Sequence, residues 1–321
     1  MKYRTLGEGT GLRVSEVALG TGRIGIGGGG ESDPIEAGRV LRAFADAGGT
    51  LIDTSSAYQG GRAEEMLGDF LAEAGRDAFV VSSKYTRTTM RQPPVAAFGN
   101  HRGAMQREVE GSLRRLKTDR IDLYFAHLDD GLTPVEEIMR GFDELARAGK
   151  IVHAGLSNFP AWRTAAAAAA RGTTPLAAVQ LQYNLLERSI EREHLPLARA
   201  RGFGVLAWSP LAGGRLKGGS APAVDAAPVK DVVERVAREL ACDAATIALA
   251  WVMAKGALPV IGARHRGHLE ASLRTLELRF TEGHVQRLDA ASAKPLGYPY
   301  DLVASSREGV GIAGDRVGAI L

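Results

Sequence analysis

The chain alternates short runs of β-branched and other apolar residues with longer stretches in which apolar residues recur every three or four positions. The first pattern is typical of buried strands and the second of amphipathic helices. Strands are predicted at Val17–Gly20, Thr50–Asp53, Ala78–Ser82, Ile121–Ala126, Ile151–Leu156, Ala177–Leu181, Gly204–Trp208 and Ala257–Ile261. Helices are predicted at Pro34–Ala47, Ala63–Ala74, Arg102–Lys117, Pro134–Ala148, Pro160–Arg171, Arg192–Ala200, Pro228–Leu240 and Arg264–Leu276. This alternation predicts an α/β fold, a (β/α)8 TIM barrel built from βαβ units.

Turn-forming residues support these boundaries. The pairs Asp33-Pro34 and Thr133-Pro134 each place a capping oxygen before a proline at the first turn of a predicted helix. Glycines that are expected to end helices are Gly48, Gly75, Gly149, Gly172 and Gly202.

Two predicted elements lie outside the barrel. The segment Lys2–Val14 is predicted to form an N-terminal β-hairpin, and Thr281–Ala293 an extra C-terminal helix followed by a tail that contains Gly and Pro. No linker or repeat divides the sequence, so residues 1–321 are expected to form a single domain.

Composition narrows the functional classes. The net charge is +3 and arginines are scattered without long runs, which argues against nucleic-acid binding and fits an anionic small molecule better. Cys242 is the only cysteine, so an intrachain disulfide is excluded and a reducing compartment is expected. The start lacks a signal-like apolar run, and the apolar stretch Ala244–Ala263 is interrupted by Lys255. We therefore expect a soluble cytoplasmic protein.

Four polar residues in the first half of the chain carry the strongest chemical signal. Asp53 and Tyr58 occur in LIDTSSAY, Lys84 in FVVSSK and His127 in IDLYFAH. Three of them stand at or just past the end of an apolar run, and Tyr58 follows a few residues beyond the first. Since the carboxyl ends of barrel strands hold the catalytic groups of this fold, the four are expected to meet there.

These four side chains have the chemistry of a proton donor. Reduction of a carbonyl requires a hydride at carbon and a proton at oxygen, and a neutral tyrosine can supply the proton. A neighbouring lysine cation lowers the pKa of a phenol, and a carboxylate keeps that lysine charged. The expected roles are thus proton donor for Tyr58, activator for Lys84, partner of the lysine for Asp53 and carbonyl-orienting group for His127. Singly, each has a structural explanation, but their joint placement favours catalysis.

The chain resembles aldo-keto reductases from about Tyr3 to Tyr300. The resemblance rests on LIDTSSAYQGGRAEEMLG, SLRRLKTDRIDLYFAHLDD, ELARAGKIVHAGLSNF, VQLQYNLLER, LAWSPLAGGRL and VIGAR, in this order and spacing. The GNHRG stretch (Gly99–Gly103) and TPVEEIM are further similar to the aryl-alcohol-dehydrogenase-like branch. The resemblance implies an NADPH-dependent oxidoreductase that reduces an aldehyde or ketone to an alcohol, reversibly, without a Rossmann domain. It also leaves a monomer as the default state, with an oligomer not excluded.

The resemblance also implies which residues contact NADPH. Polar groups at strand ends would hold the carboxamide, Trp208 would stack on the nicotinamide, and the backbone of Ser209–Gly213 would hold the pyrophosphate. Arg264, after Gly262, would bind the 2′-phosphate. The full set is Gly20, Thr21, Ser157, Asn158, Gln180, Trp208, Ser209, Pro210, Leu211, Gly213, Arg215, Gly262, Arg264, His268 and Ser272.

Departures from the family pattern leave some properties open. His268 and Ser272 stand where the family often has Gln and Asn, facing the adenine or its ribose, so the preference for NADPH over NADH is open. Gln59 follows Tyr58 where Gly is usual. The physiological substrate and direction are likewise open.

Two other functional classes remain. One is a catalytically weak, NADPH-binding regulatory subunit on the same barrel, as in potassium-channel β subunits, although those carry an added N-terminal segment. The other is a cofactor-free lyase or isomerase that uses Lys84 as a Schiff base, which the neighbouring Asp53 disfavours because it keeps the amine charged. No metal site is predicted, since His127 and Asp129 lack further ligands at metal-site spacing.

Loops around the expected site would shape the substrate pocket. Gly20–Gly25 matches a dinucleotide fingerprint, but glycines continue to Gly30 before a helix begins, so a rim loop is expected instead. The other loops are Tyr85–His101, Leu128–Leu132, Gly213–Ala227 and the tail after Pro295. The basic residues Arg87, Arg91, His101 and Arg102 fit either an anionic or hydroxylated substrate or a solvated loop that leads into a helix.

Overall fold

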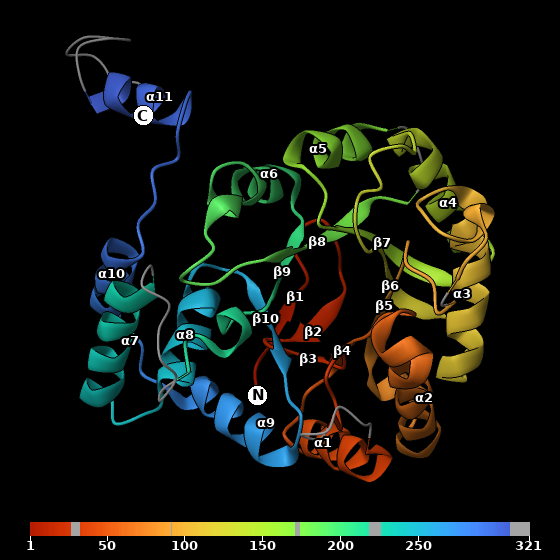
Figure 1. The fold of residues 1–321 in the computed structure, drawn as a ribbon, viewed down its shortest axis with the longest axis horizontal. Helices are drawn as coiled ribbons and strands as arrows, with labels where there is room; N and C mark the ends of the chain where they lie inside the picture. The colour runs from red at the N-terminus through yellow and green to blue at the C-terminus, as the bar shows by residue number, and fades with distance from the viewer. Residues whose placement is uncertain (27–32, 91, 171–173, 218–225, 309–321) are drawn as a thin grey trace.

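A computed structural model describes residues 1–26, 33–90, 92–170, 174–217 and 226–308 (Figure 1). Eight parallel strands close into a barrel in the order β10-β3-β4-β5-β6-β7-β8-β9, which confirms the predicted TIM-barrel fold. The barrel strands are β3 (Ala18–Gly20), β4 (Leu51–Asp53), β5 (Val80–Tyr85), β6 (Ile121–Ala126), β7 (Ile151–Ser157), β8 (Leu176–Gln182), β9 (Gly204–Trp208) and β10 (Leu258–Gly262).

A ring of helices surrounds the barrel (Figure 1). The helices that follow successive barrel strands are α1 (Pro34–Asp46), α2 (Arg62–Ala74), α3 (Arg102–Leu116), α4 (Val135–Arg147), α5 (Ala161–Ala169), α6 (His194–Arg201), α8 (Ala244–Ala254) and α9 (Arg266–Leu273). Three more helices are α7 (Ala227–Glu239), α10 (Glu282–Ala291) and α11 (Tyr300–Glu308). Within the described part of the chain, no helix is both long and apolar enough to cross a lipid bilayer.

Helix ends agree with most of the expected turn chemistry. The Asp33 carboxylate accepts hydrogen bonds from the backbone N–H groups of Ile35 (2.9 Å) and Glu36 (3.2 Å), as an N-cap does. Positive φ angles occur at the helix-ending glycines Gly48, Gly75, Gly149 and Gly202, whereas Gly172 lies outside the described residues.

The predicted cap at Thr133 is wrong. Pro134 is the N-cap of α4 and no side chain caps this helix. The Thr133 hydroxyl instead donates to the Asp130 carboxylate at 2.7 Å. The threonine side chain is therefore held by the loop that precedes the helix.

The segment between β9 and β10 differs from the prediction of one helix. Both α7 and α8 occur there, and it is α8 that packs on β10, while α7 packs outside α8 together with α10. The sequence of α8 is apolar nearly all round, and Ile247, Leu249 and Trp251 are all fully buried. A helix covered on every side lacks the one-sided apolar spacing by which a surface helix is found.

The N-terminal hairpin closes one end of the barrel. Strands β1 (Tyr3–Thr5) and β2 (Arg13–Ser15) pair antiparallel, as expected. Leu6 and Val14 pack with residues that begin barrel strands, including Leu51 and Leu258. Leu6 also packs tightly on Gly204, since a Cβ added to this glycine would lie only 2.6 Å from the leucine side chain. The amino ends of the strands are thus plugged, and the carboxyl ends are left for a functional site.

The tail contains an element that the sequence did not predict. Helix α11 lies away from the barrel, at the end of an extended segment that follows α10 (Figure 1). The Tyr300 hydroxyl donates to the Glu193 carboxylate at 2.5 Å, which ties the start of α11 to the start of α6.

Candidate active site

The four expected catalytic residues come together at the carboxyl ends of the barrel strands. Asp53 is the last residue of β4, Tyr58 opens the short 3-10 turn that follows, and His127 comes directly after β6. Lys84 was expected beyond the end of its strand, but β5 continues through Tyr85, so the lysine lies within it. All but Tyr58 are buried, and the Tyr58 side chain is partly exposed.

Lys84 joins the other members of the group. Its Nζ lies 2.7 Å from Asp53 Oδ2, 2.8 Å from the Thr54 carbonyl and 3.3 Å from Tyr58 Oη. Burial by itself lowers the pKa of Lys84, but the Asp53 carboxylate and Tyr58 act in the opposite direction, and the net result is a raised pKa. The lysine therefore stays positively charged beside the phenol.

His127 faces Tyr58 as a neutral imidazole. The two rings meet edge to face, with centroids 5.7 Å apart. Burial, followed by the positive charges of Lys84 and Arg87, lowers the pKa of His127 to about 3. Its Nδ1 lies 3.1 Å from Ser55 Oγ, a contact to a fully buried hydroxyl. The imidazole thus stays uncharged at neutral pH, with Nδ1 engaged by serine.

The residues expected to hold a carboxamide form a connected polar cluster beside this group. Asn158 Nδ2 donates to the His127 carbonyl (2.9 Å) and to Ser157 Oγ (3.0 Å), and its Oδ1 accepts from Trp208 Nε1 at 3.0 Å. Gln180 Nε2 donates to Asp53 Oδ1 at 2.9 Å. Asn158 has a φ of 56°, a left-handed conformation that asparagine tolerates better than most residues. Asn158 thereby links the ends of β6, β7 and β9, and Gln180 links β8 to β4.

The segment after β9 has the open backbone expected of a phosphate-binding loop. Ser209 has a φ of 52°, and its Oγ accepts from the Gly213 N–H at 2.9 Å. Gly213 itself has a φ of 69° and no atom within 4 Å of an added Cβ. Pro210 is buried and Arg215 is exposed. The Leu211 side chain is half-buried in the core beside this loop.

A cluster of cationic and imidazole side chains lies between β10 and α9. Gly262 ends β10, and Arg264 is exposed just before α9. The rings of His265 and His268 lie 3.6 Å apart. Burial, then the positive charge of Lys217, lowers the pKa of His268. This end of the barrel is therefore suited to an anionic group.

Two of the expected cofactor residues use their hydroxyl groups inside the protein. Ser272 is buried, and its Oγ donates to the His268 carbonyl at 2.9 Å. Thr21 Oγ1 donates to the Asp53 carbonyl at 3.2 Å, beside Gly20 at the end of β3. Ser272 thus supports the backbone of His268, and Thr21 supports the backbone of Asp53.

The glycine-rich stretch after β3 does not form a helix within the fingerprint-like motif. Residues 22–25 are in turns, and α1 begins only at Pro34. Residues 27–32 of the expected rim loop, Arg91, and residues 218–225 of the expected substrate loop lie outside the described chain.

Sequence reasoning did not identify Ser55 as a partner of His127, or the way Gln59 is held. Gln59 Nε2 donates to the Ile24 carbonyl at 3.1 Å, which joins the turn after β4 to the loop after β3. The sequence does mark Gln59 as unusual, because it departs from the family pattern directly beside Tyr58. For Ser55 the only signal was its place between Asp53 and Tyr58.

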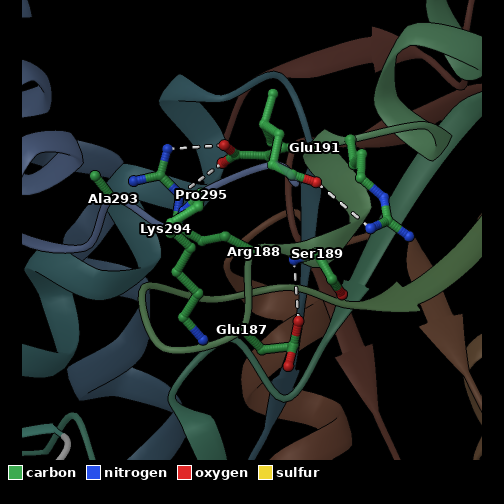
Figure 2. Close-up of a pocket in the computed structure, with 9 residues that line it drawn as sticks. Glu187, Arg188, Ser189, Glu191, Ala293, Lys294 and Pro295 are labelled. Atoms are coloured by element: carbon green, nitrogen blue, oxygen red, sulfur yellow. Dashed lines mark hydrogen bonds and ion pairs between the residues drawn. The ribbon is translucent and has the colours of Figure 1, made fainter. Parts of the chain in front are cut away.

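A separate groove of about 470 Å³ lies between the β8–α6 loop and the start of the tail, and none of the four candidate catalytic residues lines it. Figure 2 shows two contacts in it: Arg188 pairs with Glu191 at 2.8 Å, and the Glu187 carboxylate accepts from the backbone N–H of Ser189 at 3.0 Å. Arg188 also pairs with Asp289 at 3.2 Å. Arg188, Glu191 and Glu187 are thus engaged within the protein.

No group of three or more His, Cys, Asp or Glu side chains in the described ranges is arranged to hold a metal ion.

Comparison with known proteins shows the family of this chain. The family model described as "Aldo/keto reductase family" matches residues 16–293. Norsolorinic acid reductase of Aspergillus flavus is 33% identical over 94% of this chain and 84% of that protein. An aryl-alcohol dehydrogenase [NADP(+)] of Phanerodontia chrysosporium is 30% identical over 93% of this chain and 88% of that protein.

An uncharacterized oxidoreductase of Bacillus subtilis, YrpG, is 35% identical over 92% of this chain and 98% of that protein. Among solved structures, the thermostable aldo-keto reductase Tm1743 in complex with the inhibitor epalrestat matches with a TM-score of 0.77 and 29% identity. That match covers 91% of this chain and 100% of the other. On this evidence, and with aryl-alcohol dehydrogenases among its relatives, the chain belongs to the aldo/keto reductase family.

Proposed function

We propose that this protein is an NADPH-dependent oxidoreductase that reduces an aldehyde or ketone to an alcohol, and that Tyr58 donates the proton. The observation that carries the proposal is the chain of contacts from Asp53 through Lys84 to the partly exposed phenol of Tyr58. Membership of an oxidoreductase family and similarity to an aryl-alcohol dehydrogenase [NADP(+)] support it. The reverse oxidation uses the same groups.

The proposed proton transfer follows from the charges around Tyr58. When Tyr58 gives its proton to the developing alkoxide of the substrate, a phenolate remains. The Lys84 ammonium, 3.3 Å away, stabilises that negative charge, and Asp53 at 2.7 Å holds the ammonium in place. Because the pKa of Lys84 is raised by these partners, the neutral amine that a Schiff-base lyase requires is disfavoured.

The neutral His127 is assigned to orient the substrate carbonyl. Ser55 Oγ accepts from the Ala57 N–H at 3.3 Å and has one proton to donate. Its two acceptors are His127 Nδ1 at 3.1 Å and the Lys84 carbonyl at 3.4 Å, so we assign the proton to the shorter contact. The proton of the imidazole is then on Nε2, where it can donate a hydrogen bond to the carbonyl oxygen.

The polar cluster fits a nicotinamide nucleotide. Bound NADPH would supply the hydride. The amide groups of Asn158 and Gln180 offer both donors and acceptors to a carboxamide, and the half-exposed Trp208 offers an aromatic face. The exposed Arg264 can bind a phosphate through two hydrogen bonds, which is the basis for proposing NADPH over NADH.

The test is a turnover assay with purified protein, NADPH or NADH, and a panel of aromatic and aliphatic aldehydes and ketones. We expect oxidation of NADPH with formation of an equal amount of alcohol, and slower reaction with NADH. The Lys84→Met variant is the control for adventitious reduction. Tight NADPH binding without turnover of any carbonyl would overturn the enzymatic assignment and favour a regulatory subunit.

A further inference from the structure

Arg87 lies beside the candidate catalytic group on the loop that follows β5. The preceding residue, Thr86, accepts a hydrogen bond from the His127 N–H on its Oγ1 at 3.1 Å. The Arg87 carbonyl accepts from Ser56 Oγ at 3.4 Å. The segment that carries Arg87 is therefore hydrogen-bonded to the loop after β4, which carries Tyr58. It is also hydrogen-bonded to His127, which orients the substrate in the proposed mechanism.

The charge of Arg87 is available to a ligand. Its side chain is exposed, and no carboxylate in the described chain forms an ion pair with it. The positive charge is near enough to His127 to contribute, after burial and Lys84, to the low pKa of that imidazole. A cation placed this way acts on anything that sits against the imidazole.

The acidic residues of the neighbouring β6 loop are already engaged. Asp129 pairs with Arg163 at 2.8 Å. Asp130 accepts from the backbone N–H groups of Asn100 at 2.8 Å and Thr133 at 2.9 Å. These carboxylates are thus occupied by their own partners, and neither pairs with Arg87, which has no ion-pair partner among the described residues.

Two exposed apolar side chains, Phe98 and Leu132, stand on loops that are hydrogen-bonded to the segment that carries Arg87. Phe98 is 45% exposed and Leu132 is 87% exposed. The Gly99 N–H, next to Phe98, donates to the Thr86 carbonyl at 2.9 Å, and the Leu132 N–H donates to Asp130, which also holds the β5 loop through Asn100. The described parts of the loops after β5 and β6 therefore carry both apolar surface and the Arg87 cation.

We propose that Arg87 anchors an anionic group of the substrate, so that the preferred substrate class is an aldehyde or ketone with a carboxylate on an apolar, preferably aromatic, body. The proposal rests on the proposed function of the same site. A guanidinium binds a carboxylate with two parallel hydrogen bonds, while Phe98 and Leu132 cover the apolar body. The carbonyl at the other end of the substrate then lies between Tyr58 and His127.

The experiment compares two substrates that differ only in charge, 4-carboxybenzaldehyde and methyl 4-formylbenzoate, with saturating NADPH. The proteins are the wild type, Arg87→Gln, and the matched control Arg23→Gln, which removes an exposed arginine from the neighbouring β3 loop. We expect the wild type to prefer the acid. Arg87→Gln should lower kcat/KM for the acid by about 10- to 100-fold, mainly through KM, as loss of a charge-assisted pair does. The ester should change by less than about twofold in either variant.

Three results would overturn the proposal. Equal loss for acid and ester in Arg87→Gln would mean that the arginine supports the loop and not the anion. An equal effect of Arg23→Gln on the acid would mean that overall charge steers the substrate. If the wild type reduces both substrates without preference, the proposed substrate class is refuted while the reductase assignment stands. If it reduces neither substrate nor any other carbonyl compound, both the substrate class and the reductase assignment are refuted.

Discussion

The buried, neutral state of His127 predicts a specific pH dependence of stability. Burial together with Lys84 and Arg87 lowers the pKa of this imidazole to about 3 in the folded protein. In the unfolded chain it returns to the ordinary value of about 6.5. Between these two values the unfolded state binds a proton that the folded state does not, so acid favours unfolding. The free energy of unfolding is therefore unaffected by His127 above pH 6.5. It falls progressively as the pH is lowered from 6.5 toward 3.

The size of the effect follows from the two pKa values. Lowering the pH from 8 to 5 protonates His127 almost fully in the unfolded chain and hardly at all in the folded protein. The linkage relation gives a loss of about 2 kcal/mol in the free energy of unfolding over this interval. Replacing His127 with glutamine, which keeps a polar side chain but does not titrate, removes this contribution.

The assay is urea unfolding of the wild type and His127→Gln at pH 8 and pH 5, followed by circular dichroism. The other titrating groups are common to both proteins, including His153, whose pKa is also lowered by burial. Their contributions cancel when the variant is subtracted. The wild type should lose about 2 kcal/mol more than the variant between the two pH values. An equal loss in both proteins would refute the neutral, buried state of His127.

Three further predictions concern other parts of the site and its support. Arg264→Ala should weaken NADPH binding about 10- to 100-fold and NADH binding less than about twofold, as measured by quenching of tryptophan fluorescence; equal losses would exclude a contact with the 2′-phosphate. Ser55→Ala should lower kcat about tenfold and leave the Kd of NADPH unchanged; an unchanged kcat would show that the hydroxyl does not set the His127 tautomer. Arg115→Met, which leaves Glu64 buried without its 2.8 Å partner, should lower the free energy of unfolding by about 3–5 kcal/mol in urea. Combining it with Glu64→Gln should restore much of that loss, and no recovery would contradict the unpaired-charge explanation.

The barrel was predictable because its strands and helices differ in their pattern along the chain. Short apolar runs at regular intervals, each followed by an amphipathic helix, specify parallel βαβ units. The same reasoning placed Asp53, Tyr58 and His127 at one end of the barrel, since the carboxyl ends of parallel strands share an edge. Helix α8 was missed because its buried sequence has no polar face.

The contacts within the site were less predictable than its location. Ser55 and His127 are separated by 72 positions, and their contact depends on the register of β4, β5 and β6. The Asn158–Trp208 hydrogen bond similarly joins two strand ends 50 positions apart. A sequence pattern gives the face and the end of an element, but side-chain pairing across strands is fixed by rotamers and packing. Within the described residues, the lack of an ion pair at Arg87 likewise depends on contacts that the sequence does not show, those of Asp129 with Arg163 and of Asp130 with backbone N–H groups.

The most direct test of the central claim is a paired measurement on Tyr58→Phe. The substitution removes only the phenolic oxygen, which contacts Lys84 at 3.3 Å, and keeps the ring beside His127. The account predicts that NADPH binds with its Kd within about twofold of the wild type, while kcat for carbonyl reduction falls by about 100- to 10,000-fold. A kcat within about tenfold of the wild type, with NADPH still bound, would show that Tyr58 is not the proton donor and would contradict the proposed mechanism.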